Sequence, residues 1–164
     1  VEKGGYFLNN EMDDFSSKPG VPNMFGLVGG TANEIAPEKR MLSAMTPTIV
    51  EKDGQLTMIA GTPGGSTIIT SVFQTILNVY DFKMSIQKAV DAPRFHHQWL
   101  PDHLILEPER FNDQIIKKLQ QKGYNIKEKE ARIIGRVDAI HVDSDGKIST
   151  GADKRGDDRA AVLR

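Results

Sequence analysis

Alternating apolar and polar residues predict two hairpins in this chain. The first joins residues 48–50 to 56–60 across Asp53-Gly54, and the second joins residues 139–142 to 147–149 across Asp145-Gly146. Asp-Gly is a strong hairpin signal because both positions tolerate the positive φ angles that a tight two-residue turn requires. Two further short strands are expected at residues 5–9 and 103–106.

Three segments carry apolar residues at helical spacing. The longest, residues 68–80, follows a glycine-rich turn at residues 61–66. A short helix at residues 86–90 should end before the next proline, because the residue that precedes proline is pushed out of the helical region. The third helix covers residues 111–119 and should be terminated by Gly123 in a left-handed cap.

Residues 16–46 are rich in Gly, Pro, Ser and Asn and are expected to be mostly loop. A loop of this length in a domain is usually either functional or disordered. Within it, Lys39-Arg40 and Ser43 offer cations and a hydroxyl to a carboxylate, although most such groups face solvent. The later charge run at residues 127–130 is most simply a solvated face.

Composition narrows the class of protein. The 164 residues fit one domain or a piece of one, and the net charge of −1 argues against nucleic-acid binding. No apolar run approaches the roughly 20 residues that cross a bilayer. The absence of cysteine excludes disulfides and thiolate nucleophiles but leaves the compartment open. Because the first residue is Val1 and not Met, we expect the natural start to lie upstream.

Three carboxylates within four residues, Glu11, Asp13 and Asp14, could bind a hard cation or a substrate ammonium group. On base rates they are surface charges. If the strand at residues 5–9 continues, Asp14 shares a face with Met12, and Glu11 lies on the other face. One ligand could not then meet all three carboxylates, so the sequence predicts no metal site and no cofactor.

The Gly61–Thr67 turn could direct backbone N–H groups at an anion or a developing oxyanion. A nucleotide P-loop is excluded, because Gly65 stands where that motif needs a lysine before Ser66. By themselves, these glycines favour a plain tight turn.

Two other clusters favour structural explanations. Residues 143–146 faintly resemble a calcium loop, but His141 stands where an acidic or amide ligand is needed, so we expect a hairpin turn. His96, His97 and His103 lie close together in the sequence, yet no catalytic order can be assigned from proximity alone. They are expected to be structural histidines.

Three motifs, taken in order, closely resemble the small subunit of γ-glutamyltranspeptidases. They are LNNEMDDFS at residues 8–16, KRMLSAMTPTIV at residues 39–50 and GTPGGS at residues 61–66. The resemblance extends to residues 151–153 and implies an α+β fold, the four-layer αββα arrangement of N-terminal nucleophile hydrolases. Residues 1–164 would then be the C-terminal part of the small subunit, in a single domain shared with the large subunit.

In that family a precursor cleaves itself, and the new N-terminal Thr of the small subunit becomes the nucleophile. The resemblance implies a γ-glutamyltransferase and hydrolase that acts on glutathione-like amides through a γ-glutamyl-enzyme, which water or an acceptor amino acid or peptide resolves. It also implies a heterodimer with the large subunit and a periplasmic or extracellular location.

The resemblance assigns roles to five residues of this chain. Glu11 and Asp14 match the positions that hold the substrate α-ammonium, and Ser43 matches a donor to the α-carboxylate. Gly64 and Gly65 match the oxyanion hole. This last assignment agrees with the independent prediction of a strand, a glycine turn and a helix.

Two departures from the family pattern matter. Ala44 replaces a second serine, which removes one hydroxyl from carboxylate recognition. The catalytic Thr and a substrate-binding Asn should precede Asn9 by some tens of residues, and Val1 has no hydroxyl with which to replace the nucleophile. The chain alone is therefore expected to be inactive, and the family's large subunit would supply an Arg for the α-carboxylate.

Two alternatives remain open. The first is a glutaryl or cephalosporin acylase of the same superfamily, whose substrates carry no α-ammonium group. Asp14 argues against it, because its carboxylate would face an uncharged methylene. The second is a non-catalytic homologue that serves as a folding partner or binding module.

Overall fold

The computed structural model describes residues 4–6, 11–127 and 133–163. The chain divides into two compact units, Val1–Ala44 and Met45–Arg164. The described part of the first unit contains two short 3₁₀ helices, η1 (Glu11–Asp14) and η2 (Thr31–Asn33), within an otherwise irregular chain. The prediction that residues 16–46 are mostly loop is confirmed. The strand expected at residues 5–9 lies mostly outside the described residues.

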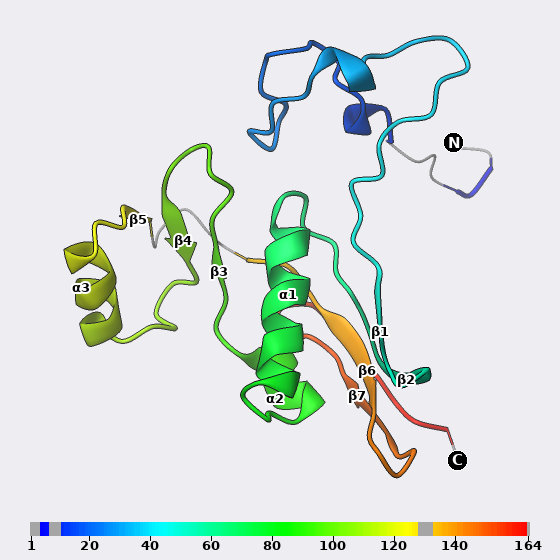
Figure 1. Cartoon of the computed structure of the whole chain (residues 1–164), viewed down its shortest axis with the longest axis vertical. Helices are drawn as coiled ribbons and strands as arrows, with labels where there is room; N and C mark the ends of the chain where they lie inside the picture. The colour runs from blue at the N-terminus through cyan, green and yellow to red at the C-terminus, as the bar shows by residue number, and fades with distance from the viewer. Residues whose placement is uncertain (1–3, 7–10, 128–132, 164) are drawn as a thin grey trace. The chain divides into compact units, whose positions relative to one another are not determined.

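The second unit is built on a four-stranded antiparallel sheet of order β1-β2-β6-β7 (Figure 1). Its strands are β1 (Thr48–Lys52), β2 (Gln55–Gly61), β6 (Asp138–Val142) and β7 (Ile148–Gly151). Both predicted hairpins are confirmed. Asp53 and Gly54 have φ angles of 53° and 74°, the pair of positive values that a two-residue turn of this kind needs.

Two helices, α1 (Thr67–Tyr80) and α2 (Ile86–Asp91), pack on one face of this sheet (Figure 1). Both confirm the helical spacing read from the sequence. Met58 and Ala60 of β2 point into this layer, where they join Val72 of α1 and Val90 of α2 in the core. The alternation of side chains along β2 therefore decides which face receives the helices.

The opposite face of the sheet is apolar and exposed. Ile49 pairs with Ile59, and Ile59 pairs with Ile140, so three isoleucines form a row across β1, β2 and β6. Their exposed fractions are 66%, 38% and 39%. Among the described residues no helix covers this row, and we call it the isoleucine face.

A second sheet, of order β3-β4-β5, has strands β3 (Phe95–His96), β4 (Leu104–Leu106) and β5 (Ile126–Lys127). Helix α3 (Asp113–Gln121) contacts β5. The Asn112 side chain caps α3 by accepting from the Ile115 N–H at 2.8 Å, and Gly123 after it has a φ of 92°, as expected. Lys127 pairs with Ile105 in the sheet and is partly exposed, so its place on a solvated face stays a prediction; residues 128–130 lie outside the described part.

In the described part of the chain, no helix is both long and apolar enough to cross a membrane.

Candidate active site

The acidic motif forms the 3₁₀ helix η1, and the expected strand alternation at these residues is wrong. In a 3₁₀ helix residues three apart lie on the same side, because each turn takes three residues. Glu11 and Asp14 therefore share one side of η1, whereas a strand would separate them. Both are partly exposed. The structure thus pairs the two carboxylates that the motif assigns to an ammonium group.

Asn33, which the sequence analysis did not select, links this acidic turn to the segment that carries Ser43. Its side-chain amide donates to the Asp14 backbone carbonyl at 2.6 Å. Its side-chain oxygen accepts from the Leu42 N–H at 3.0 Å. One side chain therefore ties the backbone at Asp14 to the backbone next to Ser43. An amide can do this because it carries a donor and an acceptor together.

Ser43 is exposed, and no described residue forms a hydrogen bond with its hydroxyl. The Asp14 carboxylate likewise has no partner among the described residues, since Asn33 engages only its backbone. Lys39 Nζ uses two of its three N–H donors within the loop, on the carbonyls of Ala32 and Glu34 at 2.7 and 2.9 Å. Lys39 thus stabilises the loop.

The glycine turn between β2 and α1 has an unusual backbone. Gly64 and Gly65 have φ angles of 150° and 56°, and their carbonyls accept the first hydrogen bonds of α1, from Thr67 and Ile68. Among the described residues no acceptor meets the N–H of Gly64 or Gly65. Both amides precede a helix, where backbone N–H groups favour negative charge. This geometry suits an oxyanion hole.

A buried ion network lies elsewhere in the second unit. Arg94 Nη1 is 2.7 Å from Asp153 Oδ2, and Arg155 Nη1 is 3.0 Å from Asp153 Oδ1. Arg155 also forms an ion pair with Glu107. Burial favours a higher pKa for Asp153, but hydrogen bonds from the Arg155 N–H and the Arg94 guanidinium outweigh it and lower that pKa. Asp138 shows the opposite behaviour: partial burial, with Asp158 nearby, raises its pKa.

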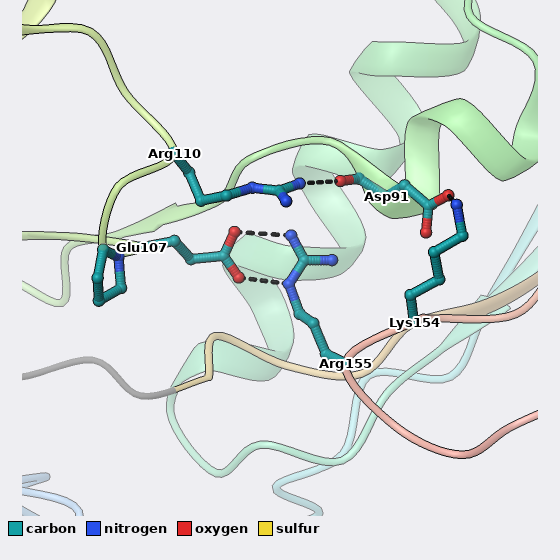
Figure 2. A pocket seen from close by; sticks show the side chains of 6 residues that line it. Asp91, Glu107, Arg110, Lys154 and Arg155 are labelled. Carbon is teal, nitrogen blue, oxygen red and sulfur yellow. Dashed lines mark hydrogen bonds and ion pairs between the residues drawn. The ribbon is translucent and has the colours of Figure 1, made fainter.

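A pocket of about 370 Å³ borders this network and is shown in Figure 2. Its charged groups pair with one another. Lys154 Nζ lies 2.8 Å from Asp91 Oδ2, Arg110 donates to the Asp91 carbonyl at 2.6 Å, and Arg155 holds Glu107. None of the five residues singled out by the sequence motifs lines the pocket. We therefore do not assign the active site to it.

His96 and the second Asp-Gly turn have structural roles. His96 is buried, with its two ring nitrogens at 2.8 Å from Thr70 Oγ1 and 2.9 Å from Gln98 Oε1. The Asp143 side chain accepts from the N–H groups of Asp145 and Lys147, which closes the hairpin turn. Among the described residues, no group of three His, Asp or Glu side chains is arranged to hold a metal ion.

The five predicted site residues fall in two groups. Glu11, Asp14 and Ser43 belong to the first unit, where Asn33 joins the backbone of Asp14 to that of Leu42, and Gly64 and Gly65 belong to the second. Each group has a geometry suited to its assigned role. That both groups meet in one cavity stays a prediction.

Comparison with known proteins gives one consistent family. The sequence pattern of the family described as gamma-glutamyltranspeptidase matches residues 1–163. The glutathione hydrolase proenzyme of Escherichia coli K12 is 49% identical over 156 residues, which are 95% of this chain and 26% of that protein. This chain therefore spans about a quarter of that relative's length.

Solved structures agree with this result. One is a γ-glutamyltranspeptidase from Pseudomonas nitroreducens, complexed with L-DON, with a TM-score of 0.89 and 45% sequence identity to this chain. The match covers 100% of this chain and 85% of the chain in that structure. A cephalosporin acylase from Bacillus halodurans is more distant, with a TM-score of 0.73 and 26% sequence identity. That match covers 80% of this chain and 25% of the acylase chain. The α+β fold of the N-terminal nucleophile hydrolases is thereby confirmed.

Proposed function

Because the chain belongs to the γ-glutamyltranspeptidase family, we propose that its parent protein is a γ-glutamyltransferase and glutathione hydrolase. The observation that carries the proposal is the arrangement around η1. Glu11 and Asp14 share one side of that turn, and Asn33 ties it to the segment that bears Ser43. A γ-glutamyl group presents an ammonium and a carboxylate on one carbon, so it needs acceptors and donors held close together.

Glu11 and Asp14 would accept hydrogen bonds from the substrate α-ammonium. Such charge-assisted bonds contribute about 1.5–3 kcal/mol each. The Ser43 hydroxyl would donate to the α-carboxylate. Ala44 offers no hydroxyl there, so this chain makes one side-chain contact where the family pattern has two serines.

The N–H groups of Gly64 and Gly65 would stabilise the oxyanion that forms when the γ-amide carbonyl is attacked. The nucleophile would be an N-terminal Thr of the small subunit, outside this chain. Its hydroxyl attacks the carbonyl carbon and its α-amine takes the hydroxyl proton. The α-amine then gives this proton to the amide nitrogen, which leaves as an amine when the C–N bond breaks. Water or an acceptor amine then displaces the γ-glutamyl group from the enzyme.

The isoleucine face supports a further part of the proposal, the large-subunit partner. Exposed apolar patches of this kind mark interaction surfaces. In a four-layer αββα fold the uncovered face of this sheet would pack on a second sheet, to which the remainder of the precursor would contribute. A periplasmic or extracellular location is proposed from the family resemblance, and cell fractionation of the full-length protein tests it.

The donor-binding role can be tested in the full-length parent protein with Asp14→Asn. Asp13→Asn is a matched control, because Asp13 lies in the same turn and is exposed. We expect Asp14→Asn to lower kcat/KM for a γ-glutamyl anilide by about 10- to 150-fold, the equivalent of one charged hydrogen bond. The control should retain wild-type kcat/KM.

Each alternative predicts a different result. Unchanged kcat/KM in Asp14→Asn would contradict the ammonium-binding role. A wild-type protein that prefers a glutaryl anilide to the γ-glutamyl anilide would be an acylase. A protein that turns over neither substrate and has no Thr at the processing junction would be the non-catalytic homologue.

A further inference from the structure

A short stretch of backbone, Ile134 to Val137, packs against the glycine turn that contains Gly64 and Gly65. The Arg136 N–H donates to Thr62 Oγ1 at 2.6 Å. A Cβ atom on Gly64 would lie 3.3 Å from the Gly135 Cα, so the two backbones are in close contact. Gly135 itself has a φ of 68°, and a side chain there would collide with Ser71 and Thr62. The position of this stretch therefore limits the position of the turn.

The same stretch is fixed on its other side by the buried Arg94–Asp153 pair. Arg94 Nη1 donates to the carbonyls of Ile134 and Gly135 at 3.1 and 3.3 Å. Asp153 Oδ2 accepts from the Val137 N–H at 2.8 Å and from Arg94 Nη1 at 2.7 Å. Arg94 and Asp153 are each 1% exposed.

From these contacts we propose that Arg94 and Asp153 are positioning residues for the Gly64–Gly65 turn. The pair holds residues 134–137, and these hold Thr62 and Gly64. The proposal rests on the oxyanion role given above to the two glycine amides. Such donors act only when they lie about 2.7–3.1 Å from the developing oxyanion, and a misplacement of about 1 Å can cost about 100-fold in rate.

The shape of the guanidinium explains why arginine is suited to this position. It is planar with five fixed donors, and here it also reaches the Val90 carbonyl through Nη2 at 2.6 Å. A lysine could keep a charged contact with Asp153, but its ammonium lacks the planar set of donors that reaches the Ile134, Gly135 and Val90 carbonyls at the same time. Arg155 Nη1 donates to the other oxygen of Asp153. Arg155 also donates to the Glu107 carboxylate, as Figure 2 shows. The Asp153 carboxylate is thus fully engaged, which favours a supporting role over ligand binding.

The contacts run from the Arg94–Asp153 pair through residues 134–137 to Thr62 and Gly64, and we call them the pathway. Two variants of the full-length protein test the proposal at its two ends. Arg94→Lys weakens the hold on the Ile134 and Gly135 carbonyls, and Thr62→Val removes the acceptor of the Arg136 N–H. Kinetics on a γ-glutamyl anilide should show at least a tenfold lower kcat for each, with the donor KM within about twofold of wild type. The double variant should be no slower than the slower single variant, because both changes interrupt one pathway. Amide hydrogen exchange of Thr67 and Ile68, whose N–H groups donate to the Gly64 and Gly65 carbonyls, should be faster in all three.

Arg110→Lys is the matched control, since Arg110 also donates to a backbone carbonyl, that of Asp91, outside this pathway. It should keep wild-type kcat and exchange. Kinetics are measured on processed protein whose folding is checked by circular dichroism. A wild-type kcat in Arg94→Lys, or multiplied effects in the double variant, would overturn the proposal. If Arg94→Lys does not fold, the test uses Thr62→Val. A wild-type kcat in Thr62→Val would then reject the proposal.

Failure of the proposed function gives a different pattern. If wild type shows no γ-glutamyl turnover, the oxyanion role is lost. Hydrogen exchange of the Thr67 and Ile68 amides then still reports whether Arg94 fixes the turn, and unchanged exchange in Arg94→Lys rejects that positioning as well.

Discussion

Arg94 and Asp153 are 59 positions apart in the sequence, yet their side chains meet at 2.7 Å and are almost fully buried. The pair joins the start of the second sheet to the end of the first. Arg155 and several backbone groups add further hydrogen bonds to the pair, and among the described residues Arg94 Nε is left without a partner. The ion pairs and hydrogen bonds make such burial tolerable, since an isolated buried charge is strongly unfavourable.

Asp153→Asn should strongly destabilise the protein. The change removes the negative partner and leaves the Arg94 charge buried without compensation, which typically costs about 3–5 kcal/mol. The midpoint of urea unfolding of the full-length protein, followed by fluorescence, measures the effect. Asp157→Asn is the control, because Asp157 is exposed and should leave the midpoint unchanged. Equal midpoints for the two variants would contradict the prediction.

The contribution of Asp153 to stability should depend on pH in the acid range alone. Its hydrogen bonds hold the folded-state pKa below the ordinary value of 3.8. A lowered carboxyl pKa gives stability that is complete above the unfolded-state pKa and is lost as pH falls through the folded-state pKa. The difference in unfolding midpoint between wild type and Asp153→Asn should thus be constant from pH 7 to about 4.5 and shrink below about 4. A difference that already shrinks between pH 7 and 5 would contradict this sign.

Gly64→Ala should impair catalysis by displacing the glycine turn. A Cβ at this position would lie 2.6 Å from Thr67 Oγ1 and 3.3 Å from the Gly135 Cα, so the turn must shift. We expect kcat for γ-glutamyl anilide hydrolysis to fall by about 10²–10³, the usual effect of losing one oxyanion donor. Gly54→Ala is the matched control, because Gly54 also has a positive φ, 74°, but no atom lies within 4 Å of the point that a Cβ there would occupy. Similar kinetics for both variants would argue against the oxyanion role.

Asn33→Ala should weaken donor binding. Without the Asn33 amide, no side chain among the described residues joins the backbone at Asp14 to the backbone at Leu42. The Asp14 carboxylate and the Ser43 hydroxyl are then no longer held at a fixed separation. The donor KM should rise about tenfold with a smaller change in kcat, in steady-state assays of the full-length protein. Asn23→Ala is a suitable control, since among the described residues its side chain accepts only from the local Phe25 and Leu27 amides. A KM equal to that of the control would reject the role of Asn33.

Elements stabilised by neighbours in sequence were predictable. The two Asp-Gly hairpins and helix α1 follow from turn residues and apolar spacing within about a dozen positions. Strands β3 and β5 were missed because each has two residues and forms by pairing with β4. A two-residue strand carries no periodic signal.

The sequence by itself determined the family, the two hairpins and the identity of the acidic and glycine motifs, because these depend on residue types at short, fixed spacing. Tertiary structure alone decided that Glu11 and Asp14 share one side of a 3₁₀ turn, and that Asn33 joins this turn to Leu42. It also decided that Arg94 is buried against Asp153. Arginine is mostly exposed in proteins, and its burial depends on partners that folding brings together from distant parts of the chain.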